Sequence, residues 1–204
     1  MKAFTTLIAT AAPLFRPNIN TDIITPMQYL IGTPRETMGS ILFAPWRFNE
    51  DGTENGDFVL NNEPFRKARI LIAGSNFACG SSRESAVWAL QGYGFRAVIA
   101  PSFSEIFVNN CYQSGVLPVV LEEDIVATFA RQAEAAPHTS LFTVDLESSV
   151  VIPPQGEPVA FDIGAFRRMA LLEGLDDLGL ARRRSGEILT FRKADRVSRP
   201  WVYV

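Results

Sequence analysis

Three short apolar segments, separated by two helical segments, constrain the fold of this chain most strongly. The apolar segments are residues 68–73 (ARILIA), 97–100 (AVIA) and 116–121 (VLPVVL). Short continuous apolar runs bounded by turn residues are typical of strands that are buried on both faces. The intervening residues 81–92 and 103–113 are predicted to be helical. Because a helix between two such strands forms a βαβ unit with parallel strands, we predict an α/β fold around a central βαβ unit.

The N-terminal part of the chain is predicted to begin with another strand. Residues 3–15 (AFTTLIATAAPLF) follow a single lysine, and three threonines interrupt their apolar run, so they lack the features of a secretory signal. Residues 13–26 are rich in Pro, Asn and Thr and are predicted to form a loop. Residues 27–63 contain strong turn signals such as NEDGTENGD and are expected to be irregular. A connection of that length is usually functional or mobile.

The C-terminal part is predicted to add one helix, several short strands and a second helix. The first helix is expected near residues 122–134, and the strands are expected at 143–146, 150–152 and 159–163. Pro118 places the preceding strand at an edge of the sheet or makes it irregular. Residues 164–180 are predicted to be helical. The polar tail from about 181 to 204 is expected to pack on the outside of a single domain that spans residues 1–204.

Composition excludes two classes of partner. The 204 residues carry a formal net charge of −3, which argues against a nucleic-acid-binding protein. No apolar run approaches the roughly 20 residues that a membrane-spanning helix needs. Cys79 and Cys111 are too few for a disulfide framework or a structural zinc site, so we predict two reduced thiols, a cytoplasmic protein and no metal bound by this chain.

The stretch GSNFACGSSRESAVWAL (residues 74–90) contains the strongest candidate for a binding site. It joins a buried strand to a helix, and the free N–H groups and dipole at a helix start favour an anion. Arg83 adds a planar guanidinium that can bind a carboxylate through two hydrogen bonds. Ser81 and Glu84 also fit a capping box, which would account for both residues without any ligand.

A carboxylate fits this loop better than a phosphate does. A phosphate loop requires Gly-x4-Gly-Lys-Ser/Thr, whereas Gly74 and Gly80 are separated by five residues and no lysine follows. The dinucleotide fingerprint is missing as well, since Gly92-x-Gly94 lies at the far end of the helix. The sole histidine, His138, lies in a loop-like stretch, so a Ser-His-Asp triad is not expected. Catalysis would therefore need groups from a second subunit, such as a metal centre.

Several blocks of this sequence, in order, resemble one known family. Residues 76–121, from NFACGSSRES to GVLPVVL, are similar to the small subunits of 3-isopropylmalate dehydratase, which correspond to the swivelling domain of aconitase. NINTDIITPMQYL (18–30) resembles that family's Asn-x-Asp-Thr-Asp-x-Ile-x-Pro block, and WRFNEDG, DFVLN and FRRMALLEGLDDLGL (166–180) also match. The resemblance covers nearly the whole chain. It implies an aconitase-like swivelling domain with β/β/α layers and mixed strands.

The resemblance also implies an activity that needs two chains. The family's hydro-lyases isomerise 2-isopropylmalate to 3-isopropylmalate in leucine biosynthesis by removing and adding back water. A [4Fe–4S] cluster on a separate large subunit would bind the leaving hydroxyl as a Lewis acid. The resemblance thus implies a heterodimer or heterotetramer in which this chain binds no cofactor. The chain would contact a small hydroxy diacid and would be inactive alone.

Site residues follow from the resemblance position by position. Ser81 stands at the place of the serine base that takes a proton from carbon, with Ser82 beside it as a substrate-binding residue. Arg83 stands at the place of the residue that holds a substrate carboxylate. A free serine hydroxyl is a poor base, so its alkoxide needs preorganised donors in a site closed to water. The helix-start N–H groups and the guanidinium would supply them.

Further positions imply supporting and specificity roles. Thr21 and Asp22, together with Glu84, would lie behind the site and support the arginine and its loop, although a local turn accounts for the first two nearly as well. Tyr29, Leu30 and Ile31 would offer apolar contact to an isopropyl group, and Arg35 would contact a carboxylate. Plain packing and solvation are the alternatives for these last four residues.

Two departures from the family pattern leave the substrate open. Ser85 occupies the place of the family's usual histidine, and Asn20 replaces the usual acidic residue before Thr21. Serine cannot supply the charge or reach of an imidazole. The rival readings are a hydro-lyase small subunit for another 2-hydroxy diacid, of the homoaconitate, citramalate or dimethylmalate type, and a carboxylate-binding module without catalysis. A polar substrate arm would fit poorly against an apolar pocket loop.

Overall fold

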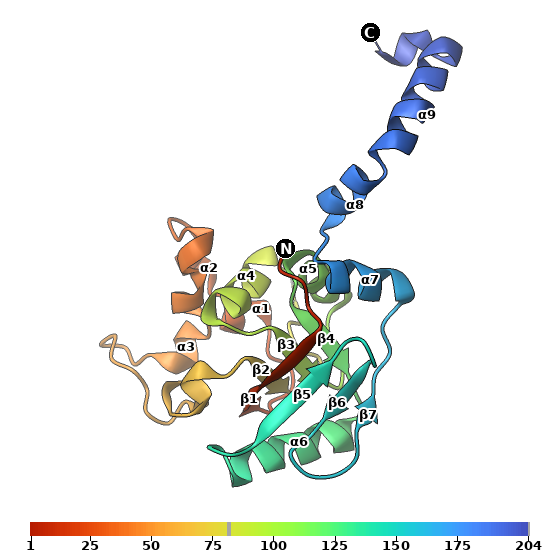
Figure 1. The fold of residues 1–204 in the computed structure, drawn as a ribbon. Coiled ribbons are helices and arrows are strands. Elements are labelled where there is room, and N and C mark those ends of the chain that lie inside the picture. Colours follow the sequence, from red (N-terminus) through yellow and green to blue (C-terminus); the bar gives the residue numbers. More distant parts are fainter. Residues whose placement is uncertain (81–82, 204) are drawn as a thin grey trace.

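A seven-stranded mixed sheet organises the computed structural model, which describes residues 1–80 and 83–203 (Figure 1). The strand order is β4-β3-β2-β1-β5-β6-β7. The strands are β1 (Thr6–Leu14), β2 (Ile70–Ala73), β3 (Ala97–Ala100), β4 (Leu117–Val120), β5 (Leu141–Asp145), β6 (Val150–Ile152) and β7 (Val159–Ala160). Strands β1 to β4 are parallel, whereas β5 to β7 are antiparallel to their neighbours. The predicted mixed α/β fold is confirmed.

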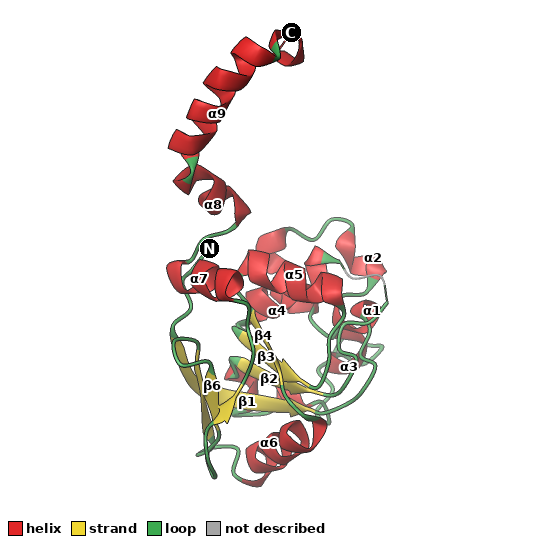
Figure 2. Ribbon diagram, turned by 90° about the vertical axis from the view of Figure 1, so that its right-hand side faces the viewer, coloured by secondary structure: helices red, strands yellow, loops and turns green. Residues whose placement is uncertain are grey.

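Successive residues of the parallel strands face opposite layers of the molecule. Leu71 and Val98 belong to the core cluster beneath helices α4 (Glu84–Tyr93) and α5 (Glu105–Ser114). Their neighbours Ile70, Ile72 and Ile99 belong to the cluster that packs against α6 (Glu123–Ala135). Figure 2 shows α4 and α5 on one side of the sheet and α6 on the other. Because both faces are covered, these strands are apolar throughout, as their sequences predict.

The predicted βαβ unit and edge strand are both confirmed. Strands β2 and β3, which α4 connects, lie side by side and parallel. Strand β4 forms one edge of the sheet, with Pro118 opposite Val98 in the register. An edge strand tolerates a proline because one row of its backbone groups needs no partner.

Residues 15–69 form a long excursion between β1 and β2. Its elements are short: α1 (Thr21–Ile24), α2 (Met27–Leu30), η1 (Arg35–Ile41), α3 (Ala44–Arg47), η2 (Val59–Asn61) and η3 (Phe65–Lys67). Segment η1 packs closely on α4, since a Cβ atom added to Gly39 would lie 2.3 Å from the carbonyl carbon of Gly92. Only glycine permits this approach. Residues 27–63, predicted to be irregular, contain only short helical turns, whereas the loop predicted for residues 13–26 is interrupted by α1.

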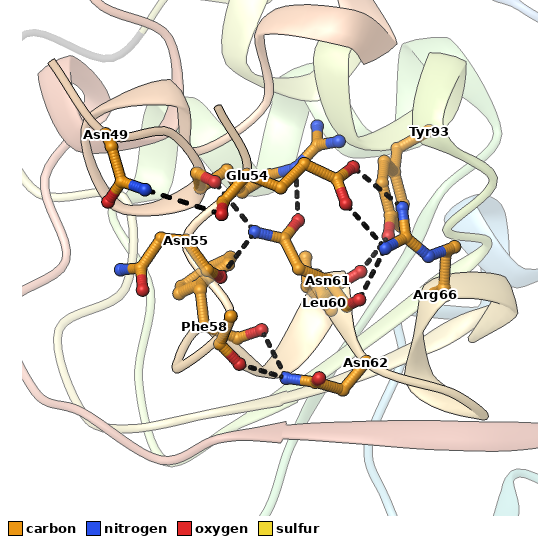
Figure 3. A network of polar contacts seen from close by, with 11 residues as sticks. Asn49, Glu54, Asn55, Phe58, Leu60, Asn61, Asn62, Arg66 and Tyr93 are labelled. Carbon is orange, nitrogen blue, oxygen red and sulfur yellow. Dashed lines mark hydrogen bonds and ion pairs between the residues drawn. The ribbon is translucent and has the colours of Figure 1, made fainter. Parts of the chain in front are cut away.

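A polar network holds the excursion together (Figure 3). The guanidinium of Arg47, a residue with 8% of its surface exposed, donates from Nη1 to the carbonyl oxygens of Gly39, Ser40 and Leu42 at 3.3 to 3.4 Å. The Nδ2 atom of Asn61 donates back to the carbonyl oxygen of Arg47 at 2.7 Å. Buried polar groups need such partners, so the network replaces regular secondary structure in satisfying this backbone.

The C-terminal region differs from its prediction in two ways. It contains α7 (Ala165–Glu173), α8 (Asp177–Arg183), α9 (Ser185–Ser198) and η4 (Pro200–Tyr203). The helix predicted for 164–180 is interrupted at Gly174, which ends α7 in the left-handed conformation at φ 69°. The tail does not pack on the outside of the domain; α9 extends away from the body in both views (Figures 1 and 2). No helix among the described residues has the length and apolar character that a membrane crossing requires.

Candidate functional site

Three loops meet where three neighbouring parallel strands end. Residues 15–20 follow β1, residues 74–80 follow β2, and residues 101–104 follow β3. Because the strands are parallel, their carboxyl ends lie at one edge of the sheet. Ligands of open α/β sheets bind at this edge. The candidate motif therefore lies where the topology of the fold favours a site.

The first two loops are joined by backbone hydrogen bonds. The N–H of Asn18 donates to the carbonyl oxygen of Ser75 at 2.9 Å, and the N–H of Ala78 donates to that of Ile19 at 2.7 Å. These bonds run like a short parallel ladder beyond the ends of β1 and β2. The loop after β1 thus follows the loop after β2 toward the start of α4.

Polar residues that the sequence analysis did not identify join the third loop. Asn76 donates from its backbone N–H to Oγ of Ser102 and from Nδ2 to Oδ1 of Asn18, each at 2.7 Å. The N–H of Phe77 donates to the carbonyl oxygen of Ser102 at 3.0 Å. The available signal was an Asn or Ser soon after each buried strand, a position where side chains often replace backbone partners.

The junction between the loops uses unusual backbone conformations. A Cβ atom added to Gly74 would lie 2.5 Å from the carbonyl carbon of Arg16, so only glycine lets the two loops touch. Asn18, Asn76 and Ala78 have φ angles of 56°, 57° and 58°. Asparagine tolerates this left-handed region, whereas alanine is strained in it by an amount on the order of 1 kcal/mol. Strain of this kind clusters at functional sites and persists where surrounding contacts enforce it.

Arg83 and Asp22 form an ion pair at the end of this ladder. The side chain of Asn20 caps α1 by accepting from the N–H of Ile23 at 2.9 Å, which places Asp22 in the first turn. Nη1 of Arg83 lies 3.0 Å from Oδ1 of Asp22, and 22% and 60% of the two side chains are exposed. The two atoms form an ion pair without a hydrogen bond. The buried Nη1 has no hydrogen-bond acceptor among the described residues.

Helix α4 begins later than the sequence predicts. Arg83 has an extended backbone at φ −116° and ψ 143° and is the N-cap, so Glu84 is the first helical residue. The predicted capping box, which requires Glu84 at the third helical position, is therefore wrong. Ser81 and Ser82 lie outside the described residues, and their roles as base and substrate-binding residue stay predictions.

Position 85 faces the protein interior. Ser85 is 7% exposed, and its Oγ lies 3.5 Å from Oγ1 of Thr25. Thr21, which is 1% exposed, accepts at its carbonyl oxygen from Thr25 and donates from its N–H to the carbonyl oxygen of Cys79 at 3.2 Å. Ser85 therefore contacts α1, and Thr21 connects α1 to the loop after β2.

The structure separates Arg35 from the ion pair. Its guanidinium carbon lies 4.7 Å from the ring centre of Trp88, on the side of α4. Arg35, Glu84 and Trp88 help to line a hollow of about 350 Å³, and Arg83 is not part of its lining. Arg35 and Glu84 therefore share a surface beside the ion pair, and contact of Arg35 with a substrate stays a prediction.

The three predicted apolar contacts differ in exposure. Tyr29 is 40% exposed and Ile31 is 91% exposed, whereas Leu30 packs partly against the core beneath α4. The segment around α2 thus presents two apolar side chains outward on a short connection. This exposure is compatible with a pocket that another surface completes, and the role of the three residues stays a prediction.

The remaining candidate groups are distributed over the molecule. Cys111 is fully buried, and burial raises the pKa of its thiol well above the ordinary value. Cys79 is half-buried, and His138 is exposed in a turn, as predicted for a loop residue. In residues 1–80 and 83–203, no three His, Cys, Asp or Glu side chains are placed to hold a metal ion.

Comparison with known proteins identifies the family and the fold. The model of the aconitase C-terminal domain family matches residues 1–124. A solved 3-isopropylmalate dehydratase structure from Methanocaldococcus jannaschii has a TM-score of 0.63 and 23% identity, and it covers 92% of this chain and 99% of its own chain. At that identity, the likeness supports the fold alone.

Curated relatives are closer in sequence. The 3-isopropylmalate dehydratase small subunit of Rhodospirillum centenum is 47% identical over 98% of both chains. That of Roseobacter denitrificans is 45% identical over 99% of this chain and 100% of its own, and that of Brucella canis is 47% identical over 98% and 100%. The chain therefore belongs to the aconitase C-terminal domain family, among the small subunits of 3-isopropylmalate dehydratase.

Proposed function

We propose that this chain is the small subunit of a two-chain cytoplasmic hydro-lyase that interconverts 2-isopropylmalate and 3-isopropylmalate in leucine biosynthesis. The names of its relatives support the reaction and the need for a large subunit. The observation that carries the proposal is the ion pair of Arg83 with Asp22, beside the junction of the three loops.

Arg83 is suited to hold a substrate carboxylate. Because its Nη1 faces Asp22, the Nε–Nη2 edge of the planar group lies on the other side. A carboxylate can therefore bind the Nε–Nη2 edge of the guanidinium through two hydrogen bonds. The charge of Asp22 attracts the guanidinium and keeps it near this position, so less freedom is lost when the substrate binds.

Ser81 is proposed to handle the proton, and Ser82 to contact the substrate. The oxygen of Ser81 accepts the proton that leaves carbon during dehydration and returns a proton when water is added back. Its negative form is stabilised by the guanidinium two residues along and by the N–H groups at the start of α4. Dehydration fits a site that another chain closes, because excluding bulk water strengthens these interactions.

The cluster of the reaction is proposed to lie on the large subunit. A [4Fe–4S] cluster supplies a Lewis acid for the leaving hydroxyl. The described residues of this chain do not fit such a cluster, because no three suitable ligands are grouped among them. The task of this chain is then to bind the carboxylate, to move the proton and to shape the pocket for the substrate side chain with Tyr29, Leu30 and Ile31.

Anaerobic reconstitution with the cluster-bearing large subunit tests the proposal. The assay compares 2-isopropylmalate with homoaconitate, citramalate and dimethylmalate, using each chain alone as a control. We expect turnover only with both chains, and fastest with 2-isopropylmalate. Preference for another diacid would change the substrate and keep the reaction class. Turnover by the isolated chain would refute the two-chain arrangement, and no turnover of any diacid would favour a binding module without catalysis.

A further inference from the structure

The C-terminal arm, defined as residues 177–203, leaves the body of the protein. Figures 1 and 2 show α8 and α9 extending from the end of α7, with the C-terminus far from the sheet. Every residue from 181 to 202 is exposed except Asp195. Helix α8 contacts the body through the pairs Gln113–Asp177 and Glu173–Arg183, whereas α9 projects beyond it. Because helices gain most of their stability from tertiary packing, a projecting helix of this length is unusual.

Large apolar side chains of the arm face solvent. Leu189, Phe191 and Trp201 are 57%, 62% and 69% exposed, and Leu178 and Val202 are 60% and 56% exposed. Single exposed apolar side chains scattered over a surface need no explanation. Several exposed apolar side chains on one projecting element are typical of an interaction site. Aromatic residues such as Trp201 also dominate the binding energy of protein interfaces.

The end of the arm is held in one conformation. The carboxylate of Asp195, which is 8% exposed, accepts from Nε of Arg199 at 2.6 Å and from the hydroxyl of Tyr203 at 2.8 Å. The guanidinium of Arg196 lies 5.1 Å from the ring centre of Tyr203. These contacts fold η4 back on α9 as a hook. A preformed hook loses less conformational entropy when it binds a partner.

The hook encloses a basic hollow. Its volume is about 480 Å³, and it is lined by Leu189 and Tyr203 together with Arg192, Lys193 and Arg196. Residues 182–203 contain seven Arg or Lys and two Asp or Glu, a net charge of +5, whereas the whole chain has a net charge of −3. The chemistry of the hollow therefore matches an acidic surface with an apolar centre.

We propose that the C-terminal arm docks on the large subunit and that its basic hollow binds acidic side chains there. This inference rests on the proposed function, which supplies the partner. The arm lies within the length that this chain shares with curated small subunits, whose matches cover 98% to 100% of both chains. A second copy of this chain, whose body is also acidic, is the alternative partner that the experiment below distinguishes.

Isothermal titration calorimetry of the full chain against its cognate large subunit tests the arm. The triple variant Arg192→Glu, Lys193→Glu and Arg196→Glu reverses the charge of the hollow, and we expect it to raise Kd at least tenfold and to flatten the salt dependence of binding. Trp201→Ala should raise Kd about tenfold without a change of charge. A matched control, Lys67→Glu, Arg69→Glu and Arg131→Glu, makes the same charge change on exposed residues of the body and should leave Kd within about threefold.

The outcomes separate the arm from the proposed function. Binding of the wild-type pair with unchanged Kd in both arm variants would overturn the arm inference alone, whereas no binding by the wild-type chain would overturn the two-chain function. A saturating excess of the arm variants should restore turnover, because the arm lies apart from Arg83. Light scattering that shows a wild-type dimer dissolved by the triple reversal would assign the arm to self-association instead. Loss of vesicle binding in that variant, with the subunit affinity intact, would assign it to an anionic membrane.

Discussion

Arg47 and Arg83 differ in how their guanidinium groups are paired. The donors of Arg47 bind the protein's own backbone, whereas Arg83 is available to a ligand. Arg47 lies in the excursion and donates to three carbonyl oxygens, and its guanidinium lies 5.1 Å from the ring centre of Tyr93. Arg83 lies at the loop junction, where its one partner among the described residues is the carboxylate of Asp22 at 3.0 Å. Both side chains are largely removed from solvent, but only Arg47 has its donors occupied.

Because of this difference, substitutions of the two arginines should affect different properties of the protein. If Arg47 were removed, the carbonyl oxygens that accept from it would be left without a donor. Its loss should therefore lower the free energy of unfolding. Burial lowers the pKa of Arg47, which shows that removing this guanidinium from water has a cost that its hydrogen bonds do not fully offset. Substitution of Arg83 leaves few groups unpaired, so it should weaken ligand binding and change the stability little. Stability and activity can therefore be measured separately.

The largest expected effect is on folding, from Arg47→Ala. Loss of three acceptor contacts and of a buried side chain should lower the free energy of unfolding by about 3 to 5 kcal/mol. Denaturant unfolding followed by circular dichroism measures this change. Arg183→Ala is the control, because its ion pair with Glu173 is largely exposed, lies outside the network and should contribute far less to stability. Equal losses in the two variants would remove the distinction between the network and an ordinary surface pair.

The sequence predicted the parallel half of the fold because its signals are local. Apolar runs such as 68–73 and 97–100 and the proline at position 118 each follow from one short stretch. The start of α4 was wrongly predicted because a capping box depends on backbone angles that a tetrapeptide does not determine. The helix predicted for 164–180 failed at Gly174, where a Cβ atom would lie 2.8 Å from the carbonyl oxygen of Met1, a contact between distant parts of the chain.

The candidate site was harder to predict than the fold. Arg83 was identified from its place in a loop before a helix, whereas Asp22, 61 positions away in the chain, was identified only by the family resemblance. The Arg47 network was missed, because NEDGTENGD reads as turns and gives no sign that residues on either side of it bury an arginine. Asn18, Asn76 and Ser102 were missed as well, since their contacts form only when three strand ends are brought together.

The second-largest effect is expected from Arg83→Lys. An ammonium cannot reproduce two parallel hydrogen bonds to a carboxylate, so kcat/KM in the reconstituted enzyme should fall about 100-fold. The melting temperature should move by no more than about 2 °C, because the side chain supports little of the fold. Arg66→Lys provides the matched control, since that arginine also pairs with a carboxylate but lies in the excursion. A similar loss in both variants would contradict the role of Arg83.

A smaller effect is expected from Asp22→Asn. The exposed carboxylate contributes little to stability, but without its charge the guanidinium is held less firmly beside the site, and kcat/KM should fall about tenfold. We expect the loss mainly in KM, with kcat changed less, because Asp22 positions Arg83 and does not contact the reacting atoms. Asp22→Glu should recover part of the activity. A variant with unchanged KM would show that the ion pair is irrelevant to binding.

The smallest effect concerns Tyr93, which borders the Arg47 network. Its hydroxyl donates to the carbonyl oxygen of Leu60 at 2.9 Å, and burial raises its pKa above the ordinary value of 10.0. A raised pKa means that stability is fully present below pH 10 and is lost as the pH rises through the folded-state value. Tyr93→Phe should lower stability at pH 8 by about 1 kcal/mol and weaken its decline above pH 10. The exposed Tyr29→Phe is the control, and an unchanged alkaline decline in Tyr93→Phe would contradict this assignment.

The most direct test of the account compares kcat/KM and melting temperature for Arg83→Lys and Arg47→Lys in the same anaerobic two-chain assay. The account predicts that Arg83→Lys loses about 100-fold in kcat/KM with an unchanged melting temperature. It predicts that Arg47→Lys melts several degrees lower and retains kcat/KM within about threefold at low temperature. Full activity in Arg83→Lys, or loss of activity confined to Arg47→Lys, would contradict the claim that Arg83 is kept available for a substrate carboxylate.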